Sequence, residues 1–310
     1  MTLVLLCPGQ GAQKVGMGRD LADRFPAARD TFAAIDDALG FGLSRLMWEG
    51  PEDELTLTHN AQPAILAHSA AVLAVVGTRL AGGVAGAGHS LGEYSAYVAA
   101  GALTPGEAAR LVRRRGELMY DADQQRPGAM AAVLGLATVD VEAACNAASA
   151  SAAGGVVVAA NLNAPDQTVI SGDPAAVEEA GRLCKERGAR RVLPLNVRGA
   201  FHSPLMVPAV DGLREALATA VFSEPTFPII ANASAELIST AVDAKRLLAD
   251  QLTAPVRWVA CIETAAATFP GATFIEVGPG SVLSGLTRRI VPDAATLTLG
   301  TADELDRFLA

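Results

Sequence analysis

The stretch GAGHSLGEYSA, from Gly86 to Ala96, decides the fold of this 310-residue chain. It sets Ser90 at the centre of a G-x-S-x-G pattern, with His89 directly before it. Between a strand and a helix, such a pattern puts the serine on a sharp turn where its hydroxyl is exposed as a nucleophile. The spacing also occurs by chance, so the rest of the chain has to supply a base, an oxyanion hole and a sheet.

Apolar runs at both ends of the chain alternate with helical patterns. Buried strands are predicted at TLVLLC (2–7), PIIAN (228–232) and TFIEVG (273–278), and helices at 20–39 and 61–81. Strands that alternate with helices favour a mainly parallel sheet covered on both faces. We therefore expect an α/β fold in which Ser90 lies at the end of a central strand.

The middle of the chain has a different order of elements. Residues 127–197 predict a strand, a helix, two strands joined by an Asn-rich turn, a second helix and a basic strand. Asp173 as N-cap and Pro174 at the first helical position mark the start of the second helix. This β-α-β-β-α-β order is that of a ferredoxin-like unit. We expect it at 127–197, inserted into a larger domain of residues 1–126 and 198–310, where it forms one wall of a cleft above Ser90.

Composition excludes several classes of protein. The net charge of −9 argues against a nucleic-acid binder, which needs a basic surface. The apolar runs are interrupted before the roughly 20 residues that a bilayer requires, and MTLVLLCPG lacks a basic flank, so it predicts a first strand and not a signal peptide. Four scattered cysteines without a C-x-x-C pair favour reduced thiols in the cytoplasm and no zinc site.

A serine nucleophile needs a base, and the chain has four histidines. His68 falls in an Ala- and Leu-rich helical stretch, which favours a structural role, and His59 lies in a polar turn. His89 adjoins Ser90, and neighbours at such a turn point in different directions. His202, in the loop RGAFHSPLM, is the candidate base; the alternative is an ordinary surface-loop histidine.

No acid is well placed to complete a triad. Asp166 and Asp173 follow Ser90 in the chain, but both lie in the predicted insertion, away from the main sheet. We therefore expect a Ser-His dyad whose imidazole is oriented by another group, such as a backbone carbonyl. CPGQGAQ (7–13), a glycine-rich turn after the first strand, offers the closely spaced N–H groups of an oxyanion hole, or is a plain strand-to-helix turn.

The helix that starts after Thr104 carries an arginine on its apolar face. Thr104 and Glu107 have the spacing of a capping box, with a proline at the first helical position. At 100° per residue, Arg115 lies at the centre of an apolar stripe on this helix. A guanidinium among apolar neighbours needs an anion, which is either the carboxylate of a structural salt bridge or that of a substrate.

Motifs along almost the whole chain resemble one known family. They are PGQGAQ, NAQPA (60–64), GHSLGEYSA, the arginine before Gly116, GAMAAVLG (128–135), ANLNAPDQTVISG (160–172), GAFHSPLM (199–206), QLTAPVRW (251–258) and IEVGPGSVLSGL (275–286). Together they resemble the malonyl-CoA:acyl carrier protein transacylases of bacterial fatty-acid synthesis. The resemblance implies an α/β-hydrolase-like core with a ferredoxin-like insertion.

The resemblance also implies roles for individual residues. Ser90 would be the acylated nucleophile, His202 its general base, and Arg115 the group that holds the malonyl carboxylate. The remaining implied site residues are Gln10 and Leu91, whose backbone N–H groups form the oxyanion hole, Gln251, whose main-chain carbonyl orients the histidine, and Gln62 and Asn161, which line the cleft. Phe201, beside His202, is expected to crowd an α-methyl branch and disfavour methylmalonyl groups.

The activity implied by the resemblance is a ping-pong transfer of malonyl from its coenzyme A thioester to the phosphopantetheine thiol of an acyl carrier protein. It needs no metal or redox cofactor, and we expect a cytoplasmic monomer that binds no nucleic acid or membrane. The alternatives are a malonyltransferase acting in trans on a polyketide synthase or in malonate decarboxylation, and an editing acyl hydrolase. GAFH around His202 is closer to the acyltransferase domains of polyketide and animal fatty-acid synthases, which leaves the pathway open.

Overall fold

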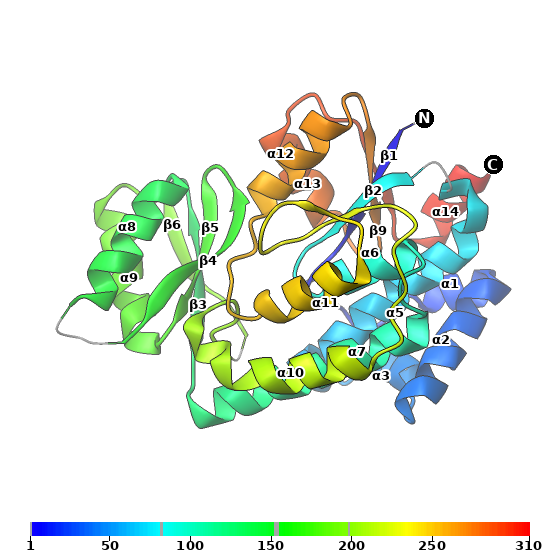
Figure 1. Ribbon diagram of the computed structural model, residues 1–310, viewed down its shortest axis with the longest axis horizontal. Coiled ribbons are helices and arrows are strands. Elements are labelled where there is room, and N and C mark those ends of the chain that lie inside the picture. The colour runs from blue at the N-terminus through cyan, green and yellow to red at the C-terminus, as the bar shows by residue number, and fades with distance from the viewer. Residues whose placement is uncertain (1, 81–82, 152–154, 198) are drawn as a thin grey trace.

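The computed structural model describes residues 2–80, 83–151, 155–197 and 199–310, and its strands form two sheets (Figure 1). Sheet A has the strand order β10 (Thr296–Leu299), β9 (Thr273–Val277), β1 (Leu3–Cys7), β2 (Gly83–Gly88), β7 (Ile229–Ile230) and β8 (Leu237–Ile238). Every pairing in it is parallel except that of β7 with β8. The predicted α/β fold with a mainly parallel sheet is confirmed.

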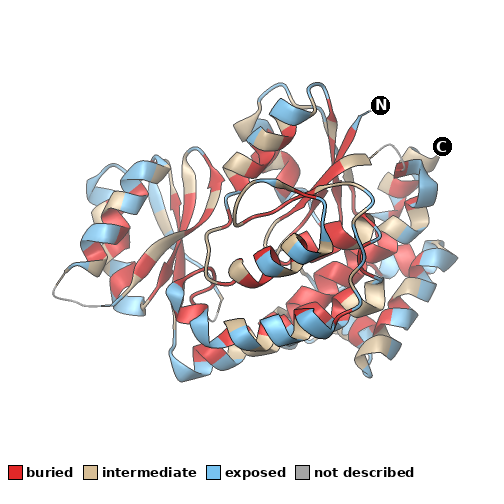
Figure 2. Ribbon diagram, viewed as in Figure 1, coloured by how far each residue is buried: buried red, intermediate tan, exposed pale blue. Residues whose placement is uncertain are grey.

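Helices bury both faces of sheet A (Figure 2). On β1 the side chains alternate, so that Leu3 and Leu5 enter one core and Val4 and Leu6 the other. The first core contains α2 (Pro26–Leu39), α5 (Thr58–Val76), α6 (Gly92–Ala99) and α7 (Pro105–Gln125), and the second contains α12 (Trp258–Thr268) and α13 (Val282–Ile290). Apart from two helices that pack on the second sheet, the other helices are α1 (Arg19–Arg24), α3 (Leu43–Glu49), α4 (Glu52–Thr56), α10 (Val207–Thr219), α11 (Ala241–Asp250) and α14 (Ala302–Leu309), with 3₁₀ turns at Gly77–Leu80 and Pro204–Met206.

The prediction of a single helix over 20–39 was wrong, because this segment forms two helices, α1 and α2, that are separated at Phe25. Phe25 has extended backbone angles, φ −119° and ψ 116°, and Pro26 starts α2. A residue that precedes a proline is driven out of the helical region by the proline ring. Proline is well tolerated in the first turn of a helix, so the same residue that ends α1 begins α2.

Helix α5 and its 3₁₀ extension form one segment, Thr58–Leu80, that is long and apolar enough by length and composition to cross a membrane. Its mean hydropathy is 1.5, and 67% of its most apolar window is buried inside the molecule. A helix that is apolar on all sides is what the centre of a large core requires.

Sheet B is a separate antiparallel sheet with the order β4 (Val157–Ala164), β5 (Gln167–Gly172), β3 (Ala129–Leu134) and β6 (Arg191–Pro194). With α8 (Thr138–Ser149) and α9 (Pro174–Glu186), its elements follow one another as β-α-β-β-α-β. On β3, Ala131 and Val133 pack beneath α8 and α9, whereas Met130 and Ala132 face the main body. The domain limits at 127 and 197 stay a prediction.

A backbone seam joins sheet B to the main body. The Val256 N–H donates to the Ala160 carbonyl at 2.8 Å, and the Leu162 N–H donates to the Val256 carbonyl at 2.9 Å. Asn161 thereby pairs with Val256 as a parallel bridge, just before α12 begins. The outer edge of β4 is thus continued by a segment of the larger body.

Two predicted helix caps form only in part. Asp173 occupies the N-cap position of α9, but its carboxylate accepts hydrogen bonds from Arg126 and from the Val156 N–H and makes no capping bond to the helix. Thr104 caps α7 by accepting from the Glu107 N–H at 3.2 Å. The Glu107 carboxylate binds Arg110 instead of returning to Thr104, so the predicted reciprocal half of the capping box was wrong.

Candidate active site

The turn between β2 and α6 forces Ser90 into a left-handed backbone conformation, with φ 53°. The two glycines beside it explain how the chain can make this turn. A Cβ on Gly88 would lie 2.0 Å from the backbone carbon of Gly92, and a Cβ on Gly92 would lie 2.2 Å from the Cys7 carbonyl oxygen. Only glycine fits at either place, so the G-x-S-x-G pattern is a steric requirement here.

His202 lies against the nucleophile, with its Nε2 2.7 Å from Ser90 Oγ. Its Nδ1 is 2.8 Å from the main-chain oxygen of Gln251. Because a carbonyl oxygen only accepts, Nδ1 carries the proton and the Nε2 lone pair faces the serine hydroxyl. Burial, and after it the charge of Arg115, lowers the pKa of His202 from 6.5 to about 3, so the imidazole is neutral and able to take a proton.

The two carboxylates considered for a triad lie elsewhere. Asp166 is paired with Arg289, and Asp173 with Arg126. The group that orients the imidazole is therefore a backbone carbonyl, as the absence of a well-placed acid in the sequence predicted.

The other three histidines do not reach the nucleophile. His68 is buried, with Nε2 2.9 Å from the Gly300 carbonyl oxygen, and burial lowers its pKa to about 4. His89 points away from Ser90 and lies 2.8 Å from Asn163 Oδ1. His59 packs edge-on against the ring of Tyr120.

Arg115 brings a buried positive charge to the nucleophile. Only 1% of it is exposed, and its Nη2 donates to Ser90 Oγ at 3.1 Å and to Gln251 Oε1 at 3.0 Å. Its Nη1 donates to Gln62 Oε1 at 2.7 Å. Among the described residues no carboxylate oxygen lies within 4.0 Å of an Arg115 nitrogen, so the structural salt bridge is not formed there. The guanidinium is held by neutral amides, and its charge is left for a ligand.

A cavity of about 390 Å³ opens above the dyad, between the main body and sheet B. Ser90 and His202 lie in its wall together with Gln10, Phe201 and Asn161, the last of which the family resemblance had implied as a cleft residue. Gln62 does not line it and reaches the site through Arg115. The apolar part of the wall is formed by Met119, Met130, Ala132, Val169, Leu195 and Val197.

Two backbone N–H groups near the dyad are candidates for an oxyanion hole. In the described part of the chain, the N–H groups of Gln10 and Leu91 donate no hydrogen bond. Leu91 precedes the first residue of α6, so its N–H also lies at the positive end of that helix.

Two buried residues at this site were missed by the sequence reasoning. Glu93, in the first turn of α6, accepts hydrogen bonds from Gln251 Nε2 at 2.7 Å and from the Asn232 N–H at 3.0 Å. Asn232 Oδ1 accepts from the Ser90 N–H at 2.7 Å. The pKa of Glu93 is raised to about 7, because the effect of burial outweighs that of these hydrogen bonds and of the Arg115 charge, which lower it. A glutamate directly after a G-x-S-x-G motif gives no sign that it is buried, and Asn232 is far away in sequence.

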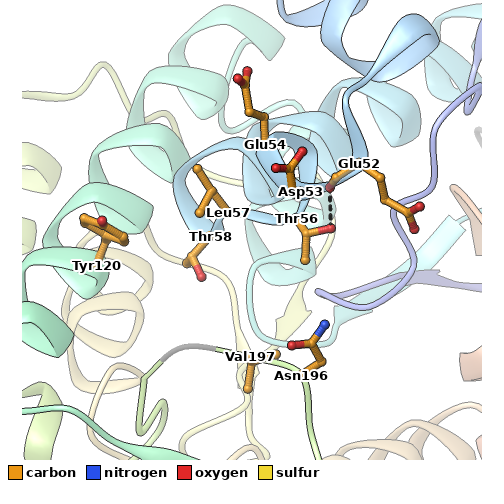
Figure 3. A pocket seen from close by; sticks show the side chains of 9 residues that line it. All are labelled: Glu52, Asp53, Glu54, Thr56, Leu57, Thr58, Tyr120, Asn196 and Val197. Atoms are coloured by element: carbon orange, nitrogen blue, oxygen red, sulfur yellow. Dashed lines mark hydrogen bonds between the residues drawn. The ribbon is translucent and has the colours of Figure 1, made fainter.

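A larger cavity of about 630 Å³ adjoins the first, and both are lined by Asn196 and Val197. Figure 3 shows its other wall, which includes Glu52, Asp53 and Glu54 of α4 and, farther along, Tyr120 of α7. None of its described lining residues is a nucleophile with an adjacent base, so the chemistry belongs to the smaller cavity.

The α/β core, the strained serine and the neutral histidine define an acyl-transfer enzyme with a serine nucleophile. The sequence profile described as "Acyl transferase domain" matches residues 4–299, and the chain belongs to this family. It is 44% identical over 305 residues to the malonyl CoA-acyl carrier protein transacylase of Bacillus subtilis. The alignment covers 98% of this chain and 95% of that relative.

Solved structures agree with this assignment. The acyl-carrier-protein S-malonyltransferase of Bartonella henselae is 43% identical, with a TM-score of 0.94 over 100% of this chain and 98% of that one. A malonyl-transacylase solved in complex with a type II polyketide synthase acyl carrier protein is 40% identical, with a TM-score of 0.94 over 100% and 99% of the two chains. The family resemblance predicted from the motifs is confirmed.

Proposed function

We propose that this protein transfers the malonyl group from malonyl-CoA to the phosphopantetheine thiol of an acyl carrier protein, through a malonyl ester of Ser90. The observation that carries the proposal is the buried guanidinium of Arg115, which lies 3.1 Å from the nucleophilic oxygen and has no carboxylate partner among the described residues. A free carboxylate at the far end of a short acyl group would supply that partner. Relatives named malonyl CoA-acyl carrier protein transacylase support the same substrates.

In the first half-reaction, Ser90 Oγ attacks the thioester carbonyl while its proton passes to His202 Nε2. The Gln251 carbonyl holds the other imidazole proton and stabilises the imidazolium that forms. The N–H groups of Gln10 and Leu91 would stabilise the oxyanion of the tetrahedral intermediate. Collapse of the intermediate breaks the C–S bond, and coenzyme A leaves as a thiol with the proton from Nε2.

The second half-reaction uses the same groups in the reverse order. The carrier thiol gives its proton to His202 Nε2 and attacks the malonyl-serine ester, and Nε2 then returns the proton to Ser90 Oγ as the ester breaks. Both steps are acyl transfers between neutral nucleophiles, so they need neither a metal ion nor a redox cofactor.

The cellular setting is proposed on more general grounds. Four buried free thiols support a reducing compartment, and we propose a cytoplasmic monomer that binds neither nucleic acid nor a membrane surface. A malonyltransferase that serves a polyketide synthase is the second candidate, because a relative with a TM-score of 0.94 was solved with such a carrier protein. Its chemistry would be the same, and only the partner would differ.

Intact-mass measurement after incubation with malonyl-CoA tests the proposal. The native protein should gain one malonyl group and lose it again when the carrier protein is added, whereas Ser90→Ala should gain none. Ser95→Ala is the matched control, since Ser95 is a buried serine of the following helix, α6, and lies outside the dyad. A malonyl adduct on Ser90→Ala would assign the nucleophile to another residue, and failure of the native protein to react would refute the proposed substrate.

A further inference from the structure

Glu93 is a buried carboxylate that the mechanism above does not use. It is 0% exposed, and one of its oxygens, Oε2, accepts from both Gln251 Nε2 and the Asn232 N–H. Its other oxygen, Oε1, has no partner among the described residues. A buried carboxylate is costly unless its surroundings compensate its charge, so its place directly beneath the nucleophile requires an explanation.

The compensating charge is the guanidinium of Arg115, which is separated from the Glu93 carboxylate by a single side chain. The amide of Gln251 lies between the two ions: its Oε1 accepts from Arg115 Nη2 at 3.0 Å, and its Nε2 donates to Glu93 Oε2 at 2.7 Å. A flipped amide would set its NH₂ group against the guanidinium donors and its oxygen against the carboxylate. Both contacts would be repulsive, so the charges on the two sides fix the orientation of the amide.

Because Gln251 separates Glu93 from Arg115, the guanidinium donors are not occupied by a carboxylate of the described residues, as they would be in a direct ion pair. If Glu93 touched the guanidinium, it would occupy the donors of Arg115 and neutralise the charge that a substrate needs. With Gln251 in between, Arg115 is oriented by neutral acceptors, Gln62 on Nη1 and Gln251 on Nη2, while Nη2 also reaches Ser90 Oγ. The negative charge stabilises the buried cation from a distance, and Arg115 Nε is left without a partner among the described residues.

We propose that Glu93 is a positioning residue for substrate selectivity: through Gln251 it holds Arg115 in the orientation that binds a carboxylate-bearing acyl group. This inference rests on the proposed malonyl transfer. It assigns to Glu93 no contact with the substrate, and it separates the side chain of Gln251, which serves Arg115, from the main-chain carbonyl of the same residue, which serves His202.

The decisive variant is Glu93→Gln, measured at pH 8 with malonyl-CoA and acetyl-CoA as separate donors. The amide oxygen of the new side chain can keep both hydrogen bonds at the Oε2 position, so the change removes mainly the charge. The ratio of kcat/KM for malonyl to that for acetyl should fall about 10-fold or more, since the malonyl carboxylate loses a correctly oriented partner. The acetyl group has no carboxylate for Arg115 to bind, so the acetyl reaction should change by less than about 3-fold.

Gln251→Leu breaks the same bridge from its other end and keeps the carbonyl that orients His202. It should lower the malonyl-to-acetyl ratio to a similar degree, and the double variant should be no worse than the poorer single one, because both act on one linkage. Glu276→Gln is the matched control. Glu276 is equally buried and accepts two backbone N–H groups, those of Leu283 and Ser284, so its substitution should lower stability and leave the ratio unchanged.

Equal losses with both donors in Glu93→Gln, or losses that multiply in the double variant, would overturn the inference in favour of a purely structural role for Glu93. If Glu93→Gln does not fold, Gln251→Leu decides alone, and an unchanged ratio in that variant overturns the inference. A native enzyme with no preference for malonyl would instead refute the proposed function, so the two failures are distinguishable.

Discussion

Replacing Arg115 by alanine should change which acyl groups the enzyme accepts while leaving its acylation chemistry intact. The guanidinium is 1% exposed, so its interactions are hardly screened by solvent. A carboxylate that binds two of its N–H donors gains two charge-assisted hydrogen bonds, each worth about 1.5–3 kcal/mol. Losing about 3–6 kcal/mol corresponds to roughly a 10²- to 10⁴-fold lower rate with malonyl-CoA.

Acetyl-CoA should respond differently, because an acetyl group leaves the same guanidinium without an anion. Its removal takes away the donors to Gln62, Gln251 and Ser90 Oγ but no bond to the acetyl group, so the acetyl rate should change by less than about 10-fold in either direction. Arg115→Lys should fall between the native enzyme and alanine, since lysine keeps the charge and loses the planar pair of donors.

The assay is the rate of Ser90 acylation by each donor, followed by intact mass, with Arg114→Ala as the control. Arg114 is the neighbouring residue on α7, its side chain is 50% exposed, and its ion pair with Glu117 is 3.8 Å long. That variant should behave as the native enzyme does. An equal loss of malonyl and acetyl transfer in Arg115→Ala would show that the arginine supports the fold only, and the proposed substrate would then rest on relatives alone.

Two further outcomes follow from the site and its surroundings. His202→Ala should lower acylation by more than about 10²-fold, the usual contribution of a general base, whereas Asp166→Asn should cost little; equal losses would restore a conventional triad. Reversing the charge of Arg190 and Arg191, beside the edge strand β6, should raise KM for an acidic carrier protein and weaken its salt dependence, with the malonyl-CoA half-reaction unchanged. Damage to both half-reactions would instead indicate a defect in folding.

The parts of the fold that local sequence determines were predictable. Gly88 and Gly92 mark the nucleophile turn because no other residue fits there, and the alternation of strands and helices indicates the parallel sheet. His202 could be selected because only four histidines are present, and three of them have poor surroundings. Arg115 was found from helical periodicity, since a charge on an apolar stripe stands out.

What the sequence could not predict depends on contacts between distant segments. The group that orients His202 is a main-chain carbonyl, which any residue carries, so only the family resemblance pointed to Gln251. Glu93 has the sequence context of an exposed helical residue, and its burial depends on Asn232 and Gln251, more than 130 residues away. The break at Phe25 was missed because the helical pattern continues across it, although the following proline was a usable signal.

The seam between β4 and Val256 determines how the enzyme exchanges its substrates. Separating sheet B from the main body would break two main-chain hydrogen bonds and expose Val256, which is fully buried. We therefore expect the width of the cleft to stay constant during the reaction. Malonyl-CoA and the carrier thiol must then both reach Ser90 in the same cavity, one after the other. In kinetic terms, we expect an excess of malonyl-CoA to inhibit the reaction with the carrier protein, and an excess of carrier protein to inhibit acylation by malonyl-CoA.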